Sequence, residues 1–201
     1  MRSKWGRLVW AAIGMIFILF LLFYVLKVNV PEQQVTYDLN HDGIMEDYHL
    51  SQGKLTISQP DVIGWQSPPE WNIRSMALDD VTGDKKPELI MLLWKRGSFE
   101  RHKPLGYQQE DNRFSCHLFI CQLIGNNLIP RWCSSALDQP IRDFTIRQDS
   151  AGNNYLAVEE GSYSIYCAGE PLIFGKAYSN WVWEQWGFYG IYYRCKYDKE
   201  M

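Results

Sequence analysis

The clearest pattern along the chain is a pair of short apolar stretches separated by an acidic loop. In residues 71–94, a first stretch leads into residues 79–84, DDVTGD, and the apolar run 89–94, LIMLLW, follows shortly after. The first stretch is too short for a typical helix, and the second has the length of a buried strand. Because Gly adopts positive φ freely and Asp can bond to its own backbone, the loop suits a tight turn. The pattern therefore predicts two β-strands joined by an acidic turn.

The same strand–loop–strand pattern occurs twice more. Residues 38–47, DLNHDGIMED, contain a sharper version of the loop, and residues 144–158 contain a blurred one. The three copies lie roughly 40 to 65 residues apart, a spacing that indicates a repeat architecture. The sequence thus predicts a mainly β domain built from about three similar units.

The amino-terminal segment follows a different pattern. Residues 8–26 carry no charge, and as a helix they would span about 28 Å, close to the hydrocarbon thickness of a bilayer. Arg2, Lys4 and Arg7 precede this run, so the positive-inside rule places the amino terminus in the cytoplasm. The expected organisation is a cytoplasmic tail over 1–7, a transmembrane signal-anchor helix over 8–28, a linker over 29–36 and an extracytoplasmic domain over 37–201.

A cleaved signal peptide is the alternative for this segment. Its apolar region would be about 7–15 residues long and would be followed by a small-residue cleavage site. The run here is longer, and residues 25–31, VLKVNVP, offer no such site. An uncleaved anchor in the lipid bilayer is therefore favoured.

Charge and cysteine content narrow the classes of partner. The net charge is −3, and the first 31 residues hold four basic residues and no acidic ones. The remaining 16 basic and 23 acidic residues give the outer part a charge of −7, which argues against nucleic acid as a partner. None of the five cysteines forms a CxxC pair, so a zinc site is poorly supported.

One cross-strand disulfide is compatible with the strand pattern. Residues 117–123 and 128–133 are strand-like and flank residues 125–127, GNN, a good hairpin signal. With the turn centred there, Cys121 and Cys133 are expected to lie nearly opposite each other. Whether they bond depends on a geometry that the sequence does not give.

In residues 38–47, oxygen-bearing side chains recur at every second position. Asp38, Asn40 and Asp42 alternate, and Gly43 supplies a sharp turn. This spacing wraps a loop around a hard cation that takes about six to eight oxygen ligands. The expected ligands are Asp38, Asn40, Asp42, the backbone carbonyl of Ile44, and Glu46 or Asp47. An EF-hand is disfavoured, because it requires Glu at the twelfth position, where this chain has His49.

With the strand that follows it, this loop resembles the FG-GAP/VCBS type of repeat found in β-propellers of the integrin α-subunit kind. Those repeats carry a DxDxDGxxD pattern between two strands of a blade, and Glu46 stands at the last Asp of that pattern. The second loop is similar but has Lys85 in place of the turn Gly, and the third loop, 149–153, is out of register. In the second loop the matching residues are Asp80, Thr82, Asp84 and Glu88.

The resemblance covers about residues 36–160 and implies a propeller-like domain in which structural calcium (Ca²⁺) binds the acidic loops. It does not imply catalysis. The alternative is a hairpin whose acidic turn holds no metal and is closed by Asp side chains bonding to the backbone. Because fewer charged ligands mean weaker binding, calcium is expected to favour the first loop over the second.

Two further segments are candidates for contact with partners. Residues 181–193, WVWEQWGFYGIYY, are the most aromatic stretch. They predict a closing strand or hairpin buried against the other units, because large aromatic side chains mainly supply buried area. The alternative is an aromatic platform for a glycan, formed by Trp181, Trp183 and Trp186. The long polar loop 97–114 is the best candidate for contact with a partner, and the favoured alternative is a mobile surface loop without a partner.

The sequence as a whole therefore predicts a transmembrane helix followed by an all-β, propeller-like domain of about three degenerate blades, with an irregular β-sandwich as the alternative. It contains no GxSxG, HExxH, Walker or dinucleotide-binding motif, and the acidic pair Glu159–Glu160 is expected to be solvated. The expected function is a non-catalytic, membrane-anchored binding or scaffolding module. The alternatives are a cell-envelope glycan-binding protein and an accessory subunit of a membrane complex.

Overall fold

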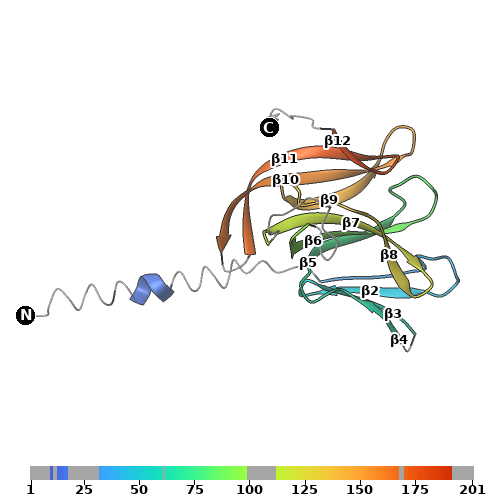
Figure 1. Cartoon of the computed structure of the whole chain (residues 1–201), viewed down its shortest axis with the longest axis horizontal. Helices are drawn as coiled ribbons and strands as arrows, with labels where there is room; N and C mark the ends of the chain where they lie inside the picture. The colour runs from blue at the N-terminus through green and yellow to red at the C-terminus, as the bar shows by residue number, and fades with distance from the viewer. Residues whose placement is uncertain are drawn as a thin grey trace, which may run out of the picture.

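The computed structural model describes residues 10, 13–17, 32–60, 62–98, 112–167 and 170–191. The described part contains three four-stranded antiparallel sheets, each formed by four strands in chain order (Figure 1). The mainly β fold predicted from the sequence is confirmed.

The first sheet comprises β1 (Gln33–Tyr37), β2 (Glu46–Ser51), β3 (Lys54–Gln59) and β4 (Val62–Gln66). The second comprises β5 (Asn72–Asp79), β6 (Glu88–Arg96), β7 (Phe114–Ile124) and β8 (Asn127–Cys133). The third comprises β9 (Ile141–Gln148), β10 (Asn154–Cys167), β11 (Glu170–Glu184) and β12 (Gly187–Ile191).

The second sheet lies between the other two, and its central strands β6 and β7 are buried on both faces. Successive side chains of a strand point to opposite faces, so β6 contributes to two cores. Leu89, Met91 and Leu93 pack against the first sheet in one core. Ile90, Leu92 and Trp94 pack against the third sheet in the other core. Burial on both faces explains why residues 89–94 are continuously apolar instead of alternating, and confirms the buried strand predicted there.

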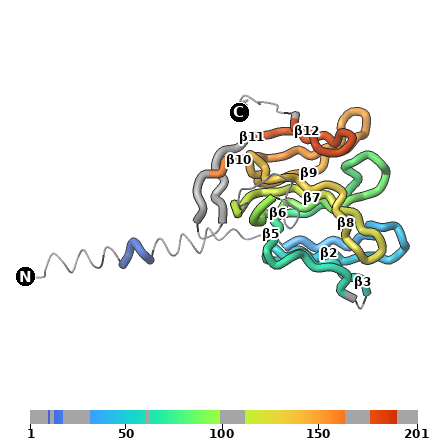
Figure 2. The backbone as a smooth tube through the Cα atoms, viewed as in Figure 1, coloured from blue at the N-terminus to red at the C-terminus, as the bar shows by residue number. Residues whose placement is uncertain are grey.

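The first hairpin of each sheet carries one of the three acidic loops identified in the sequence. These loops follow β1, β5 and β9, and all three lie on the right side of the view in Figure 2. The closing pairs are Tyr37 with Glu46, Asp79 with Glu88, and Gln148 with Asn154. The predicted strand–loop–strand repeat therefore corresponds to a repeated hairpin at the start of each sheet.

The structure corrects one predicted domain boundary and does not cover another. Strand β1 begins at Gln33, inside the predicted linker 29–36, because residues 33–37 pair with β2. Most of the predicted anchor, 8–28, lies outside the described residues, as does most of the loop 97–114. Among the described residues, the structure contains no helix with the length and apolar character needed to cross a bilayer.

Truncating a side chain in the core between the second and third sheets should destabilise the domain strongly. Leu92 is 0 % exposed, so Leu92→Ala should lower the free energy of unfolding by about 2–5 kcal/mol through lost burial and the cavity left behind. Urea denaturation of the full chain in detergent, followed by tryptophan fluorescence, measures this. The control is Ile63→Ala, since Ile63 is 63 % exposed and its truncation should change stability by no more than about 0.5 kcal/mol. Equal effects of the two substitutions would contradict the placement of Leu92.

Candidate metal centre

The first acidic loop is organised by the carboxylate of Asp38. Its Oδ1 accepts the backbone N–H of Asp42 at 3.1 Å, and its Oδ2 accepts that of Gly43 at 2.9 Å. Gly43 has a φ of +87°, a conformation that glycine adopts at little cost. Asn40 Oδ1 also accepts the Asp42 N–H, at 3.0 Å. Short polar side chains that bond to nearby backbone groups thus shape the loop.

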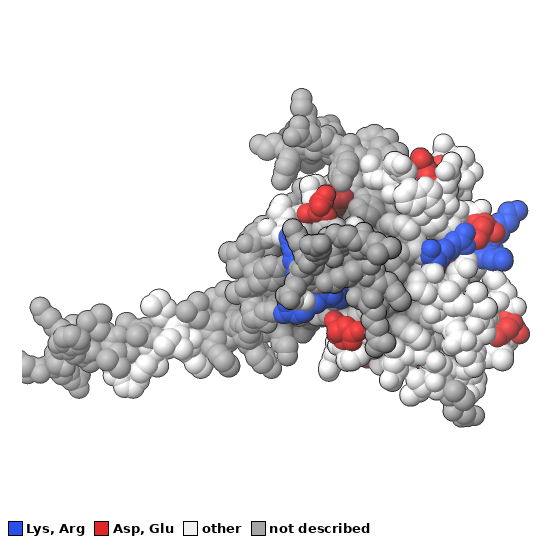
Figure 3. All heavy atoms as spheres, viewed as in Figure 1, with Lys and Arg blue, Asp and Glu red and all other residues white. Residues whose placement is uncertain are grey.

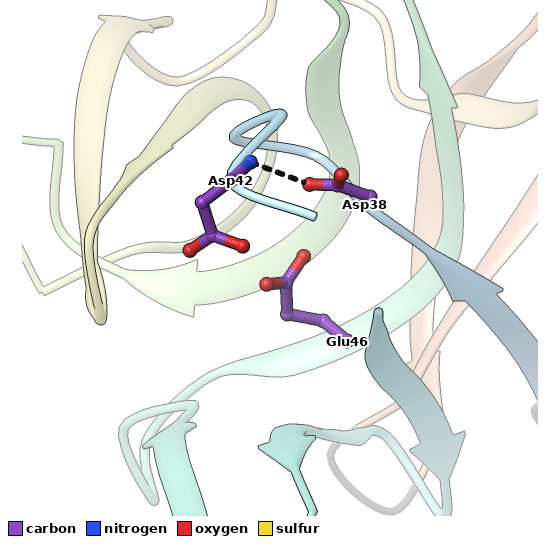
Figure 4. Close-up of side chains that lie close together, drawn as sticks. All are labelled: Asp38, Asp42 and Glu46. Carbon is purple, nitrogen blue, oxygen red and sulfur yellow. Dashed lines mark hydrogen bonds between the residues drawn. The ribbon is translucent and has the colours of Figure 1, made fainter. Parts of the chain in front are cut away.

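Three carboxylates converge inside this loop. Asp38, Asp42 and Glu46 each offer an oxygen atom, and these atoms lie within 4.8 Å of one another. Figure 4 shows the three side chains pointing toward a common space, with Asp38 and Glu46 approaching from the two strand ends. Among the described residues, no Lys or Arg forms an ion pair with any of them. An arrangement of unneutralised carboxylate oxygens is the donor set that a hard divalent cation takes.

Glu46 is the buried member of this cluster. It begins β2 and is 1 % exposed, with its side chain on the face turned toward the second sheet. Its Oε2 accepts the backbone N–H of Leu39 at 3.0 Å, and its Oε1 accepts Nε2 of Gln59 at 3.3 Å. Nearby Tyr48 is fully buried, and its pKa is raised by that burial and then by the negative charge of Glu46. The two hydrogen bonds to the Glu46 carboxylate thus come from neutral donors, a backbone N–H and a side-chain amide.

The other predicted ligands of the first loop occupy different places. Asp47, predicted as an alternative to Glu46, lies on the opposite face of β2, where it accepts hydrogen bonds from Gln34 Nε2 at 3.1 and 3.0 Å. Adjacent strand residues point to opposite faces, so only Glu46 can reach the cluster. Asn40 borders the cluster and donates to Asp42 Oδ2 at 2.8 Å. The backbone N–H of Ile44 donates to Asp42 Oδ1 at 2.8 Å, and the role of its carbonyl stays a prediction.

The second loop repeats this construction position by position. Asp80 takes the place of Asp38, and its two oxygens accept the N–H groups of Gly83 and Lys85, both at 2.7 Å. Glu88 Oε2 accepts the N–H of Val81 at 3.1 Å, matching the bond from Leu39 to Glu46. Lys85 has a φ of +66°, so it keeps the conformation of the Gly it replaces. Asp80, Asp84 and Glu88 offer oxygens within 4.8 Å of one another, as their counterparts do.

The second loop differs from the first because a basic side chain from another strand contacts its carboxylates. Arg131 of β8 places Nη1 2.5 Å from Asp84 Oδ2 and 3.2 Å from Glu88 Oε1. Thr82 Oγ1 donates to the same Glu88 oxygen at 2.7 Å. In the view of Figure 3, basic and acidic side chains lie together at the right edge, where the loops project. The sequence comparison of the two loops could not reveal this difference, because Arg131 lies 43 positions after Glu88.

Arg131 and burial act in opposite directions on the two carboxyl groups. Partial burial works to raise the pKa of Asp84, but hydrogen bonds from Arg131 and the Lys86 backbone, with the charges of those residues, lower it overall. Burial raises the pKa of Glu88, and hydrogen bonds from Thr82 and Val81 offset only part of that rise. The more exposed carboxylate is therefore the one that Arg131 holds most firmly in its charged form.

The third loop is shorter and gathers no carboxylate cluster. Asp149 accepts the N–H groups of Ala151 at 2.8 Å and Asn153 at 2.9 Å, and Asn153 Nδ2 at 3.1 Å. These hydrogen bonds from Asn153, the largest influence, lower the pKa of Asp149. At the position of Glu46 and Glu88 stands Asn154, whose amide donates to the Asp80 carbonyl at 2.6 Å. The third loop therefore closes a turn, and Asn154 joins its sheet to the second loop.

The predicted aromatic residues form part of a cluster between the second and third sheets. Phe188 packs edge-on against Trp132 at 5.5 Å and Trp183 at 5.2 Å between ring centroids. Trp132 of β8 was not identified from the sequence, because it lies about 50 positions away from the aromatic stretch. A Cβ on Gly187 would lie 3.1 Å from Trp132 Nε1, so glycine allows this close approach. The predicted closing hairpin is confirmed as β11 and β12, which pair Trp183 with Phe188.

A cavity of about 440 Å³ opens beside this cluster. Its aromatic lining combines Trp132, Trp181, Trp186 and Phe188, and Ser134 and Ser135 also line it. Trp181 is held by Glu160, whose Oε1 accepts the indole N–H at 3.1 Å. Glu160 is 1 % exposed, so the expectation that both acids of its pair are solvated is wrong; Glu159 instead pairs with Arg142 at 3.2 Å.

The predicted disulfide between Cys121 and Cys133 is not formed. The hairpin between β7 and β8 turns at residues 125–126, and this register sets Cys121 opposite Pro130. Arg131 is an extra residue of β8, and beyond it Cys133 lies opposite Phe119. Neither cysteine takes part in a disulfide. Cys121 lies in the core between the first and second sheets, where burial raises the pKa of its thiol to about 12. It is therefore a small apolar core residue and not a reactive group.

No family model matches this chain, and no curated protein or solved structure matches it either.

Removing the Asp149 carboxylate should destabilise the protein at neutral pH but not in acid. Because the folded-state pKa of Asp149 is lowered, its contribution is present above the unfolded-state pKa and is lost as the pH falls through the folded-state value. Asp149→Ala should therefore lower the melting temperature near pH 7, and the two proteins should converge near about pH 2. Asp149→Asn, which keeps an acceptor but no charge, should lose the pH dependence. A difference that persists in acid would contradict the role of the carboxylate.

Proposed function

We propose that the chain is a membrane-anchored, extracytoplasmic binding or scaffolding module without catalytic activity, whose first acidic loop holds a structural Ca²⁺ ion. The anchor rests on the uncharged run of residues 8–26 and the basic residues before it. The observation that supports the ion is the convergence of Asp38, Asp42 and Glu46 with no cationic partner among the described residues.

A propeller-like arrangement of the sheets is part of the same proposal. Three successive four-stranded antiparallel sheets, each with an acidic loop after its first strand, are consistent with three degenerate blades. Strands β11 and β12 complete the third sheet. Since complete propellers have about four to eight blades, the described sheets correspond to a partial one.

A cation in the first loop would relieve a specific electrostatic cost. Two like charges about 4 Å apart repel by about 4 kcal/mol at the effective dielectric constant near a protein surface. Three carboxylates within 4.8 Å of one another contain three such pairs. The loop backbone is already shaped by Asp38, so ion binding requires little rearrangement of the chain. The ion would thus stabilise the first hairpin, and with it the packing of the first sheet on the second.

Calcium should raise the melting temperature of the full chain in detergent. Loops of this kind with few charged ligands bind calcium with dissociation constants of about 0.1–1 mM. At about 10 mM calcium the stabilisation approaches 2.7 kcal/mol at the tighter end of that range. For a domain of this size it corresponds to roughly 5–10 °C. Differential scanning calorimetry with and without chelator measures the shift.

Asp42→Ala tests whether the ion binds in the first acidic loop. Asp42 is exposed and takes part in two of the three repulsive carboxylate pairs, so its loss should leave the chelator-treated melting temperature unchanged or raise it. It should remove most of the calcium-dependent shift. Identical melting with and without calcium in the unsubstituted protein would remove calcium from the proposal, and an unaltered shift in Asp42→Ala would place the ion elsewhere.

Glycan recognition is a second candidate function, favoured by the cavity beside the aromatic cluster. Its lining offers the flat faces of tryptophan rings together with the serine hydroxyls of Ser134 and Ser135. Flat aromatic faces suit the apolar faces of sugar rings, and hydroxyl groups suit their rims. Trp186 is 75 % exposed at the edge of this cavity, so it is free to contact a ligand.

Tryptophan fluorescence of the full chain should change on addition of soluble cell-envelope polysaccharide. Trp186→Ala should abolish most of this fluorescence change, because it removes the exposed ring that lines the cavity. The control is Tyr178→Ala, which removes a 54 % exposed aromatic side chain outside the cavity lining and should leave the response intact. No response across a panel of polysaccharides, or equal loss in both variants, would contradict glycan binding in this cavity.

A further inference from the structure

We propose that Arg131 is a built-in cation that takes the metal position of the second acidic loop, so that the protein holds a metal ion in the first loop and excludes one from the second. The proposal extends the calcium-binding function proposed above. Its statement about the first loop rests on that proposed function, and its statement about the second loop can be tested separately.

The two loops differ at one functional point. Asp84 and Glu88 are the counterparts of Asp42 and Glu46, by equal spacing from the Asp that organises each loop. Arg131 Nη1 contacts both, at 2.5 Å from Asp84 Oδ2 and 3.2 Å from Glu88 Oε1. In the first loop, Glu46 Oε1 accepts instead from the neutral amide of Gln59 at 3.3 Å. A positive group bridges two carboxylates in one loop, and none does so in the other.

The surroundings reinforce this difference in charge. The second loop also contains Lys85 and Lys86, whereas residues 38–46 contain no Lys or Arg. Counting the three clustered carboxylates against Arg131, Lys85 and Lys86, the second loop is neutral. Among the described residues, no Lys or Arg pairs with the three clustered carboxylates of the first loop. A divalent cation would therefore gain much less from the second loop than from the first.

Displacement of Arg131 by a metal ion would be unfavourable. Glu88 has a side-chain exposure of 0 %, whereas those of Arg131 and Asp84 are 29 % and 35 %, so only the Glu88 end of the contact is shielded from water. A metal ion in this position would have to replace two charge-assisted hydrogen bonds, one of them to the buried Glu88 carboxylate. Arg131 also connects β8, the outermost strand of its sheet, to the loop between the first two strands. The second loop is thereby fixed independently of the calcium concentration.

The stoichiometry of calcium binding tests this assignment. Equilibrium dialysis of the full chain in detergent against millimolar calcium should give one bound ion for the unsubstituted protein and two for Arg131→Met, which keeps an apolar stem but no charge. Arg131→Lys keeps a cation and should stay at one. The control is Arg142→Met, which removes the surface ion pair with Glu159 and should also stay at one. A folded Arg131→Met protein with unchanged stoichiometry would overturn the proposal.

The outcome separates this inference from the proposed function. If the first loop binds no ion, the unsubstituted protein should bind none and Arg131→Met one. In the double variant Asp42→Ala with Arg131→Met, one ion should remain, bound in the second loop. Loss of all binding in that double variant would show that the second loop cannot take a metal ion and would overturn the assignment.

A second measurement keeps the proposal testable if Arg131→Met does not fold. Asp84→Ala breaks the contact with Arg131 while leaving the first loop intact. It should lower the melting temperature equally with calcium and with chelator, and the calcium-dependent shift should keep its full size. Loss of the calcium-dependent shift in Asp84→Ala would mean that the second loop binds the ion, which would overturn the proposal.

Discussion

Burial of both faces of the second sheet is the constraint on which the rest of the structure depends. Strands β6 and β7 have almost no exposed position, whereas β2 in the first sheet alternates buried and half-buried residues. Burying apolar area is the main favourable term in folding, and here one sheet supplies it to two cores. The clustered carboxylates occur at the ends of strands, where the strands leave these cores. The acidic loops lie at such ends, with Glu46 and Glu88 marking the first buried residue of each strand.

Each of those glutamates has to be compensated in its buried position. A buried carboxylate is tolerated when hydrogen bonds and opposite charge replace its hydration. The backbone N–H groups of Leu39 and Val81 supply equivalent hydrogen bonds in the two loops. The charge is handled differently: the second loop uses Arg131, while the first has no cation of its own among the described residues. The same backbone construction thus supports two electrostatic solutions.

Features that depend on local periodicity could be predicted from the sequence. The strand–loop–strand pattern located the three repeated hairpins, and the continuous run of residues 89–94 identified a buried strand. The spacing of Asp38, Asp42 and Glu46 identified the carboxylates that converge. These signals are local, because turns and strands are specified by neighbouring residues.

Features that depend on pairing between distant segments could not be predicted in the same way. Arg131 and Trp132 reach their partners only because β8 lies at the edge of the second sheet. The position of the β7–β8 turn sets Cys121 opposite Pro130, three positions before Cys133, and the sequence did not fix that position. Asp47 and Glu46 were left as alternatives, since the face that each occupies depends on the register of β2.

The backbone of the two acidic loops shows what a bound ion would and would not contribute. Positive φ values occur at the same two positions of each loop, at His41 and Gly43 in the first and at Gly83 and Lys85 in the second. A non-glycine residue in that conformation costs about 1 kcal/mol or more, so the conformation is imposed by the loop and not by its residues. The carboxylates of Asp38 and Asp80 impose it through their backbone hydrogen bonds. An ion in the first loop would therefore neutralise charge rather than shape the chain, and that neutralisation is the role that Arg131 fills in the second loop.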